Sequence, residues 1–242
     1  MPVKKFWRPS VATSGAVTFS PDVGEIVEEA YERAGLQMVS GYDLRTARRS
    51  LDFLLMEWAN RGINLWCVEE RVENIVADQS EYTAINASPL VAVSILEVVL
   101  RTDSGNATNQ SDYDLARISR DTYMSIPSKL TTGRPTQIYV DRQQGSIKLN
   151  LWPVPTDATQ KLVYTYIRRM QDGGPGGTYD PDVPSRFWPA LVAGLAYNVA
   201  MKKPEAANRV QMLKQVYDEQ FQYAADEDRE KAPLRLYPGG YS

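Results

Sequence analysis

Histidine is absent from the 242 residues of this sequence, and cysteine occurs only once, as Cys67. Histidine is the usual general base near neutral pH and the commonest metal ligand, so its absence excludes a Ser-His-Asp triad and the common zinc sites. A single cysteine excludes an intrachain disulfide and a thiolate metal cluster. It fits a protein that is synthesised inside a cell.

Long apolar runs and a strong net charge are also lacking. No apolar run approaches the roughly 18 residues that a membrane-spanning helix needs, so we expect no membrane contact. The formal net charge of -3 argues against a protein whose whole surface grips DNA. With 43% apolar residues, a chain of this length can nevertheless bury a sizeable core.

Short motifs that carry chemistry are lacking as well. The run GGPGG at 173–177 has neither the GK[ST] ending of a phosphate loop nor dinucleotide-loop spacing, so we interpret it as a linker. Acid–base catalysis requires two carboxyl groups in one cleft. The pairs Glu69/Glu70 and Asp180/Asp182 instead fall on a strand edge and a loop, and the second pair lacks the further ligands of a calcium loop. We therefore expect no enzyme, with no catalytic residue, no cofactor and no metal.

The strongest helical pattern lies in residues 184–230, which predict two long helices in succession. Ser185 is the expected N-cap of the first, and Pro189 fits its opening turn, where backbone N–H groups have no helical partner. Pro204 starts the second helix, which would be roughly 39 Å long at 1.5 Å per residue. Neither helix can bury its apolar stripe alone, so other helices must pack on both. The stripes are Phe187, Leu191, Val192, Leu195, Ala196 and Val199, then Ala206, Val210, Leu213, Tyr217, Phe221 and Ala224.

Residues 20–62 predict two further helices. The first has two registers: it begins at Ser20, or it begins after Asp22 with Glu25 completing a capping box. Gly35 ends it in either register. Its predicted inward residues are Val23, Ile26, Val27, Ala30, Tyr31 and Ala34.

The second of these helices is expected over residues 43–60, with Gly62 as its stop. Its outer face carries Arg45, Arg48 and Arg49. Three arginines at helical spacing are usually a solvated face, and we favour that interpretation over a nucleic-acid patch. The predicted inward residues are Leu44, Ala47, Leu51, Leu54, Leu55 and Trp58.

Residues 63–170 change to a period of two and are rich in β-branched and aromatic residues, as strands are. We predict strands at 65–76, 80–85, 91–102, Gln137–Asp141, Ile147–Trp152 and Leu162–Ile167, with a short helix near 119–125. The last three strands are joined by short turns and predict an antiparallel meander. The fold class is therefore α+β: a helical bundle with two N-terminal and two long C-terminal helices, and an inserted antiparallel β domain.

Three segments fit no regular element. Residues 1–19 predict an extended N-terminal arm or a disordered lead-in, in which Phe6 and Trp7 either fold back on their own core or dock on a neighbouring subunit. Residues 171–183 are a Gly/Pro-rich linker, either a hinge or an ordered loop at an interface. Residues 231–242 predict an extended C-terminal tail. Its apolar side chains either lie along their own subunit or enter a partner's groove, since disordered tails usually lack them. They are Leu234, Leu236, Tyr237 and Tyr241.

Candidate DNA contacts are few. Lys4, Lys5 and Arg8 form an N-terminal basic cluster, and Arg168 and Arg169 end a strand. Aromatic residues interleaved through the β segments are compatible with a base-stacking platform. Because these aromatics fit alternating faces of sheets, core packing explains them better.

The order of these elements resembles the head-to-tail adaptor, or connector, proteins of short-tailed bacteriophages. Three stretches carry the resemblance. They are YDLRTARRSLDFLLMEWANRGINLW, then GRPTQIYVDRQQGSIKLNLWPVPTDATQKLVYTYIRRM, and VPSRFWPALVAGLAYNVAMK followed by a long helix and a proline-containing tail. Together they cover most of residues 40–230. These are packing and turn patterns, so the resemblance rests on their joint order.

The resemblance implies a ring, commonly of twelve copies, that sits beneath the portal protein of the virion and is made in the host cytoplasm. DNA would pass through the ring with transient contact, and a nozzle or tube protein of the tail would dock underneath. The C-terminal segment of such adaptors reaches the portal, which here implicates Leu234, Arg235, Leu236, Tyr237 and Tyr241.

Other functions stay open from the sequence. One is a DNA-binding factor for packaging or for stabilising the genome end. Another is a different tail-tube or head-completion protein. A cell-wall-degrading enzyme is the third alternative.

Overall fold

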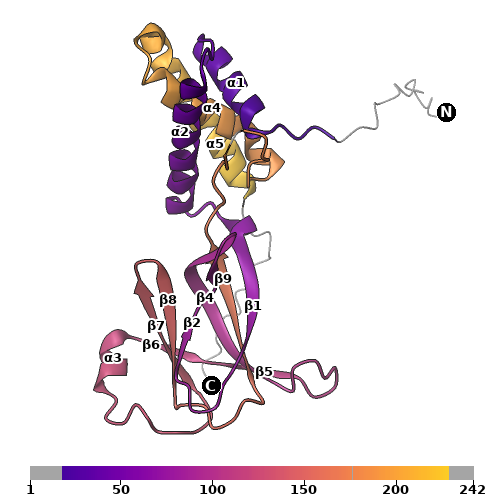
Figure 1. Ribbon diagram of the computed structural model, residues 1–242, viewed down its shortest axis with the longest axis vertical. Helices are drawn as coiled ribbons and strands as arrows, with labels where there is room; N and C mark the ends of the chain where they lie inside the picture. The colour runs from indigo at the N-terminus through magenta and orange to yellow at the C-terminus, as the bar shows by residue number, and fades with distance from the viewer. Residues whose placement is uncertain (1–17, 176, 229–242) are drawn as a thin grey trace, which may run out of the picture.

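A helical bundle and a β region lie at opposite ends of the molecule (Figure 1). The computed structural model describes residues 18–175 and 177–228. Helices and strands fall into separate parts, which confirms the α+β class. The main helices are α1 (Val23–Ala34), α2 (Gly41–Asn60), α4 (Trp188–Ala200) and α5 (Val210–Glu227), and the short α3 (Arg120–Ser125) lies in the β region. None of the helices in these described ranges is long and apolar enough to cross a membrane.

Local capping residues set the start and end of α1. The Glu25 amide donates to Asp22 Oδ1 at 2.8 Å, and the Asp22 amide donates to Glu25 Oε2 at 3.2 Å. This capping box satisfies two backbone donors and confirms the second of the two predicted registers; a start at Ser20 is wrong. Gly35 ends the helix with φ +72, a conformation that costs glycine little.

The same device starts α2 two residues earlier than predicted. Ser40 is its N-cap, and the side chains and amides of Ser40 and Asp43 form a second capping box. The helix ends at Asn60 as predicted. The predicted inward residues of the four helices are buried, apart from Leu44 and Val210, which are half-buried.

The helix α4 lies in the middle of the bundle and packs against α1, α2 and α5. Trp58 of α2 is fully buried in this core, and its indole Nε1 donates to the Tyr217 hydroxyl at 3.0 Å. The ring of Trp58 lies 5.4 Å from that of Phe187 and 5.7 Å from that of Phe221. An aromatic cluster therefore joins the N-terminal and C-terminal helices.

The C-terminal helices differ from the prediction at their starts. Ser185 opens a 3-10 turn, η2 (Ser185–Phe187), and the residues after Pro204 form another, η3 (Pro204–Arg209). The α-helical part of α5 is therefore about 27 Å long at 1.5 Å per residue. Tertiary contacts hold η3, because Ala206 is buried and Arg209 Nη1 donates to the Arg33 carbonyl at 3.3 Å.

The β region consists of two sheets that share one apolar core. The first sheet has the order β1-β9-β4-β3, with β5 also paired to β4, and the second has the order β2-β8-β7-β6. The strands are β1 (Val68–Asn74), β2 (Glu81–Thr83), β3 (Asn86–Ala87), β4 (Leu90–Thr102), β5 (Ser111–Asp114), β6 (Ala116–Ile118), β7 (Gln137–Gln143), β8 (Ser146–Trp152) and β9 (Lys161–Arg168). The predicted strand at 65–76 begins instead with a 3-10 turn, η1 (Leu65–Cys67).

The predicted antiparallel meander is wrong beyond its first hairpin. The strands β7 and β8 pair as expected, but β9 leaves them and pairs with β1 and β4 in the other sheet. The burial patterns of the two strands also differ. In β8 buried and half-buried residues alternate, whereas Leu162, Val163 and Tyr164 of β9 are buried in succession. Consecutive buried residues are typical of a strand that is covered on both faces. Among the paired strands in the described residues only β6 and β7 are parallel, so the β region is mainly antiparallel, as predicted.

Candidate functional site

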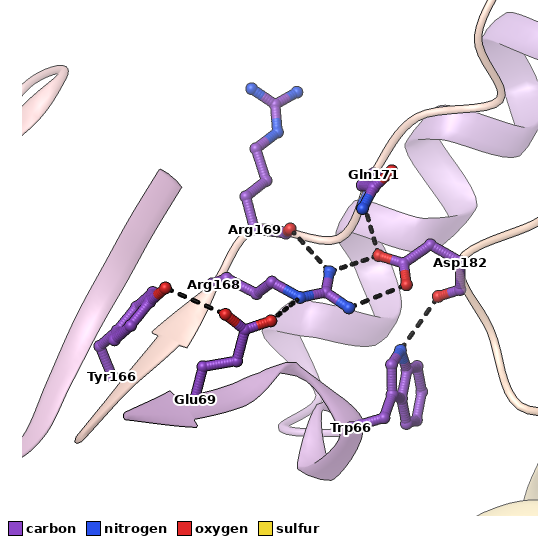
Figure 2. Close-up of polar contacts among 7 residues, drawn as sticks. All are labelled: Trp66, Glu69, Tyr166, Arg168, Arg169, Gln171 and Asp182. Atoms are coloured by element: carbon purple, nitrogen blue, oxygen red, sulfur yellow. Dashed lines mark hydrogen bonds and ion pairs between the residues drawn. The ribbon is translucent and has the colours of Figure 1, made fainter. Parts of the chain in front are cut away.

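A buried arginine joins the bundle to the β region (Figure 2). Arg168 is the last residue of β9, and its side chain is only 10% exposed. Its Nε donates to Glu69 Oε1 at 2.9 Å, and its Nη2 donates to Asp182 Oδ1 at 2.9 Å. Its Nη1 donates to Asp182 Oδ2 as well. The guanidinium therefore binds Asp182 with two nitrogens, the geometry in which arginine–carboxylate pairs are strongest.

Further hydrogen bonds hold both carboxylates in place (Figure 2). The Tyr166 hydroxyl donates to Glu69 Oε2 at 3.1 Å, and the Gln171 amide donates to Asp182 Oδ2 at 2.9 Å. Trp66 Nε1 donates to the carbonyl oxygen of Asp182 at 3.0 Å. This junction network connects the end of the first helical pair, the first sheet and the segment before α4.

The described part of the Gly/Pro-rich segment 171–183 is hydrogen-bonded to the bundle, and its two predicted roles, a hinge or an ordered loop at an interface, stay predictions. The Gly173 amide donates to Asp52 Oδ1 at 3.0 Å. The carbonyl oxygen of Gly177 accepts a hydrogen bond from Gly24 at 2.7 Å. These bonds hold the segment against α1 and α2. The bundle and the β region are therefore joined by hydrogen bonds of this segment as well as by the chain that connects them.

The pKa shifts at the junction lead away from acid–base chemistry. Burial, together with the hydrogen bond to Glu69, raises the pKa of Tyr166 to about 12. Burial raises the pKa of the Cys67 thiol to about 11, which keeps this cysteine protonated and unreactive. The hydrogen bond to Asp182 raises the pKa of Arg168. A catalytic acid or base works best with a pKa near the operating pH, so we interpret the network as a structural lock.

The carboxylate pairs of the sequence are divided between different partners. Glu69 and Asp182 bind Arg168, whereas Glu70 Oε1 lies 3.6 Å from Arg101 Nη1. In residues 18–175 and 177–228, no group of three or more His, Cys, Asp or Glu side chains is placed to hold a metal ion.

The structure separates the two arginines that were predicted together as DNA contacts. The guanidinium of Arg168 is taken up inside the subunit by two carboxylates, which explains why it is not free for a phosphate. Arg169 is exposed, and its side chain points away from the network (Figure 2). The aromatic residues Tyr82, Tyr164 and Tyr166 are buried between the sheets, which confirms core packing rather than a stacking platform.

The other predicted contact residues lie outside the described residues. These are Lys4, Lys5, Phe6, Trp7 and Arg8 in the arm, and Leu234, Arg235, Leu236, Tyr237 and Tyr241 in the tail. Their roles stay predictions.

Sequence reasoning missed an apolar cleft at the junction. It has a volume of about 510 Å³ and lies between α2 and the ends of β4 and β9. Met56, Val93 and Met170 contribute to its lining, with Arg169 at the same site. The signal in the sequence was Met56, which lies off the inward stripe predicted for its helix.

A comparison with protein families identifies the family of this chain. The family model described as SU10 adaptor protein matches residues 22–237. The chain belongs to the SU10 adaptor protein family. It is a structural adaptor of a phage and a component of the virion. The match runs through the bundle, both sheets and the junction, so it covers all of the helices and strands described above. A search of curated proteins gives no match to this sequence.

One ion pair in this adaptor predicts how its stability depends on pH. Asp43 Oδ1 lies 2.9 Å from Lys203 Nζ, which joins α2 to the end of α4. Hydrogen bonds from Lys203 and Ser40 lower the pKa of Asp43 below its ordinary value of 3.8. The pair's stabilisation is therefore present above that value and is lost as the pH falls through the folded-state pKa. We expect Asp43→Asn to unfold at lower urea concentration than wild type at pH 7, with the difference shrinking below pH 3.8.

Urea denaturation at several pH values tests this expectation. The exposed Asp218 of α5 supplies the control, Asp218→Asn. An unchanged difference between Asp43→Asn and wild type from pH 7 to below 3.8 would contradict the assigned role of the ion pair.

Proposed function

We propose that this chain is the head-to-tail adaptor of a short-tailed phage, and that it assembles as a ring beneath the portal. The ring continues the DNA channel and forms the platform on which the nozzle or tube of the tail docks. The family match over residues 22–237 carries this proposal. The resemblance to connectors of short-tailed phages supports the finer details, including a ring of about twelve copies.

The shape of the subunit supports a bridging role. The bundle and the sheets lie at opposite ends of the molecule (Figure 1), so one subunit presents different surfaces to partners above and below it. The junction network around Arg168 holds the two ends in one orientation. Because the two ends of a rigid subunit are already fixed relative to each other, binding to the portal and the tail does not cost the entropy of ordering them.

DNA contact in this proposal is transient. A net charge of -3 suits this role, since each phosphate that a protein neutralises adds affinity and would slow the exit of the DNA. The candidate contacts are Lys4, Lys5, Arg8 and Arg169, because Arg168 is occupied within the subunit. The mechanism uses no cofactor and no catalytic residue.

Imaging the purified protein with the portal of the same virus tests the function. Negative-stain images of the mixture should show a ring added to one end of the portal. Persistent monomers that leave the portal unchanged would overturn the adaptor proposal. A salt-dependent gel shift with DNA under those conditions would favour the packaging factor instead.

The C-terminal tail supplies a more specific prediction. Deleting residues 232–242 should abolish portal attachment, because the tail carries Leu234, Leu236, Tyr237 and Tyr241 as docking side chains. The circular dichroism spectrum and unfolding midpoint should match wild type. Replacing only Tyr237 and Tyr241 with serine should weaken attachment by a smaller factor. Full attachment by the deleted protein would remove the tail from the mechanism.

A further inference from the structure

One face of α2 exposes apolar and basic side chains in a single row, here called the α2 stripe. It comprises Tyr42, Arg45, Arg49, Phe53 and Met56, which follow one another by three or four positions. Side chains at that spacing lie on one face of a helix. The exposed fractions of Tyr42, Phe53 and Met56 are 65%, 64% and 42%.

The α2 stripe lies on the face of α2 that is turned away from the core of the bundle. The residues that α2 buries, such as Leu51 and Trp58, lie on the opposite face of the helix. Single exposed apolar residues are common, whereas a contiguous exposed row marks an interaction site. Within the described ranges, neither Arg45 nor Arg49 forms an ion pair. The α2 stripe is therefore apolar and cationic, and among the described residues its two arginines have no ion-pair partner.

A groove of opposite character lies along α1, here called the α1 groove. It has a volume of about 860 Å³ and an apolar lining of Phe19, Pro21, Ile26, Trp188, Pro189 and Val192. The Phe19 ring stands edge-on to Trp188 with the centroids 5.8 Å apart, and Phe19 remains 78% exposed. Two large aromatic rings thus offer surface for a further apolar side chain.

Glutamates border the α1 groove on the α1 side. They are Glu25, Glu28, Glu29 and Glu32, spaced so that all four share one face of the helix. Glu29 pairs with Arg33 at 2.8 Å. Among the residues that the structure describes, Glu28 and Glu32 have no cationic partner. Like charges four positions apart destabilise a helix, and an incoming cation relieves that repulsion.

We propose that the α1 groove of one copy receives the α2 stripe of a neighbouring copy. The proposal rests on the proposed ring and names the two surfaces that build it. Tyr42, Phe53 and Met56 pack against the aromatic lining, and Arg45 and Arg49 face the glutamates of α1.

Dimensions and symmetry agree with this pairing. The α2 stripe spans about 21 Å from Tyr42 to Met56, and the twelve-residue α1 is about 18 Å long. The two surfaces lie on different helices, so one copy can offer its groove to one neighbour and its stripe to another, and such head-to-tail contacts form a ring where the rotation between copies closes. The subunit's own α2 cannot enter the groove, because α2 turns its buried face, not the stripe, toward the bundle.

The N-terminal arm is the competing occupant. Lys4, Lys5, Phe6, Trp7 and Arg8 are also basic and aromatic. We favour the α2 stripe because an arm in the groove leaves the exposed row on α2 uncovered. Deleting residues 1–17 distinguishes the arm from the α2 stripe as the occupant of the α1 groove.

Two charge-reversal variants, one for each of the two proposed surfaces, test the proposal. One variant carries Glu28→Lys and Glu32→Lys, and the other carries Arg45→Glu and Arg49→Glu. Sedimentation velocity at low salt compares self-association of wild type, each variant and their mixture. Each variant alone should self-associate at least about tenfold more weakly than wild type, because like charges then meet across the contact. Mixing the two should restore association, because both mixed contacts pair opposite charges. Added salt should weaken every association.

Matched controls separate the interface from general surface effects. Lys214→Glu reverses an exposed charge on α5, and Met212→Ser removes an exposed apolar side chain there. Both should associate as wild type does, whereas Phe53→Ser should weaken association about tenfold.

Each outcome is decisive. Variants that associate like wild type overturn the pairing, and so does a mixture that stays monomeric. Association lost on deleting residues 1–17, but kept in both Phe53→Ser and Arg45→Glu/Arg49→Glu, assigns the α1 groove to the arm and also overturns it. Portal attachment is scored separately. If wild type forms a ring on the portal but the variants contradict the pairing, the adaptor function stands and the pairing is wrong. If copies associate through the α1 groove and the α2 stripe but do not attach to the portal, the pairing stands and the adaptor function is wrong.

Discussion

Replacing Arg168 with methionine is expected to destabilise the protein by about 3 kcal/mol. Methionine replaces the apolar stem of the arginine side chain but is shorter and removes the cation between Glu69 and Asp182. Breaking a buried ion pair from one side leaves uncompensated charge, and the cost stays at the lower end of the usual range because Glu69 is 35% exposed. Urea denaturation at neutral pH measures the change.

Two comparisons make the Arg168 result specific. Arg169→Met removes the neighbouring, exposed guanidinium and should change the free energy of unfolding by at most about 0.5 kcal/mol. In a double-mutant cycle with Asp182→Asn, the second substitution should cost much less once Arg168 is methionine. Equal losses from Arg168→Met and Arg169→Met would refute the assignment of the junction lock.

Replacing Trp58 with alanine is expected to cost about 3 to 5 kcal/mol of unfolding free energy. Trp58 is among the largest fully buried side chains, and it contacts Phe187 and Phe221 across the bundle. Alanine leaves a cavity between helices that are far apart in the chain and also leaves the Tyr217 hydroxyl without its donor. Thermal and urea unfolding should both shift to a less stable protein.

Variants of neighbouring residues separate packing from hydrogen bonding at Trp58. Tyr217→Phe keeps the ring but removes the acceptor of the indole N–H, which should cost about 1 to 3 kcal/mol. Phe53→Ala removes an exposed aromatic side chain from the same helix and should change stability by no more than about 0.5 kcal/mol. A Trp58→Ala protein as stable as Phe53→Ala would show that the aromatic cluster does not support the bundle.

The two stability predictions bear on the adaptor role in different ways. Trp58 lies within the bundle, so its loss weakens the helices themselves. Arg168 lies where the bundle meets the sheets, so its loss also loosens the relation between them. If a fixed relation between the two ends matters for bridging, Arg168→Met should impair portal attachment even at temperatures where it remains folded.

Local patterns in the sequence determined much of the helical part. Capping residues act on amides within three positions, so the pair of Asp22 and Glu25 marks the start of α1 without any tertiary contact. Helical spacing likewise identified the buried residues, including Trp58 and Phe221, because one face of each helix must meet the core. The short helix after Ser119 followed from the same local signals.

The pairing of strands and the partners of charged groups were decided only by the tertiary structure. Alternation shows that β9 is a strand, but its place between β1 and β4 depends on segments far away in the chain. Arg168 is separated from Glu69 by 99 positions, and no local pattern links two charges across that distance. The α2 stripe was visible as residues but not as a surface. Its meaning depends on the exposure of Phe53 and on the acidic groove along α1, and only folding places either of them.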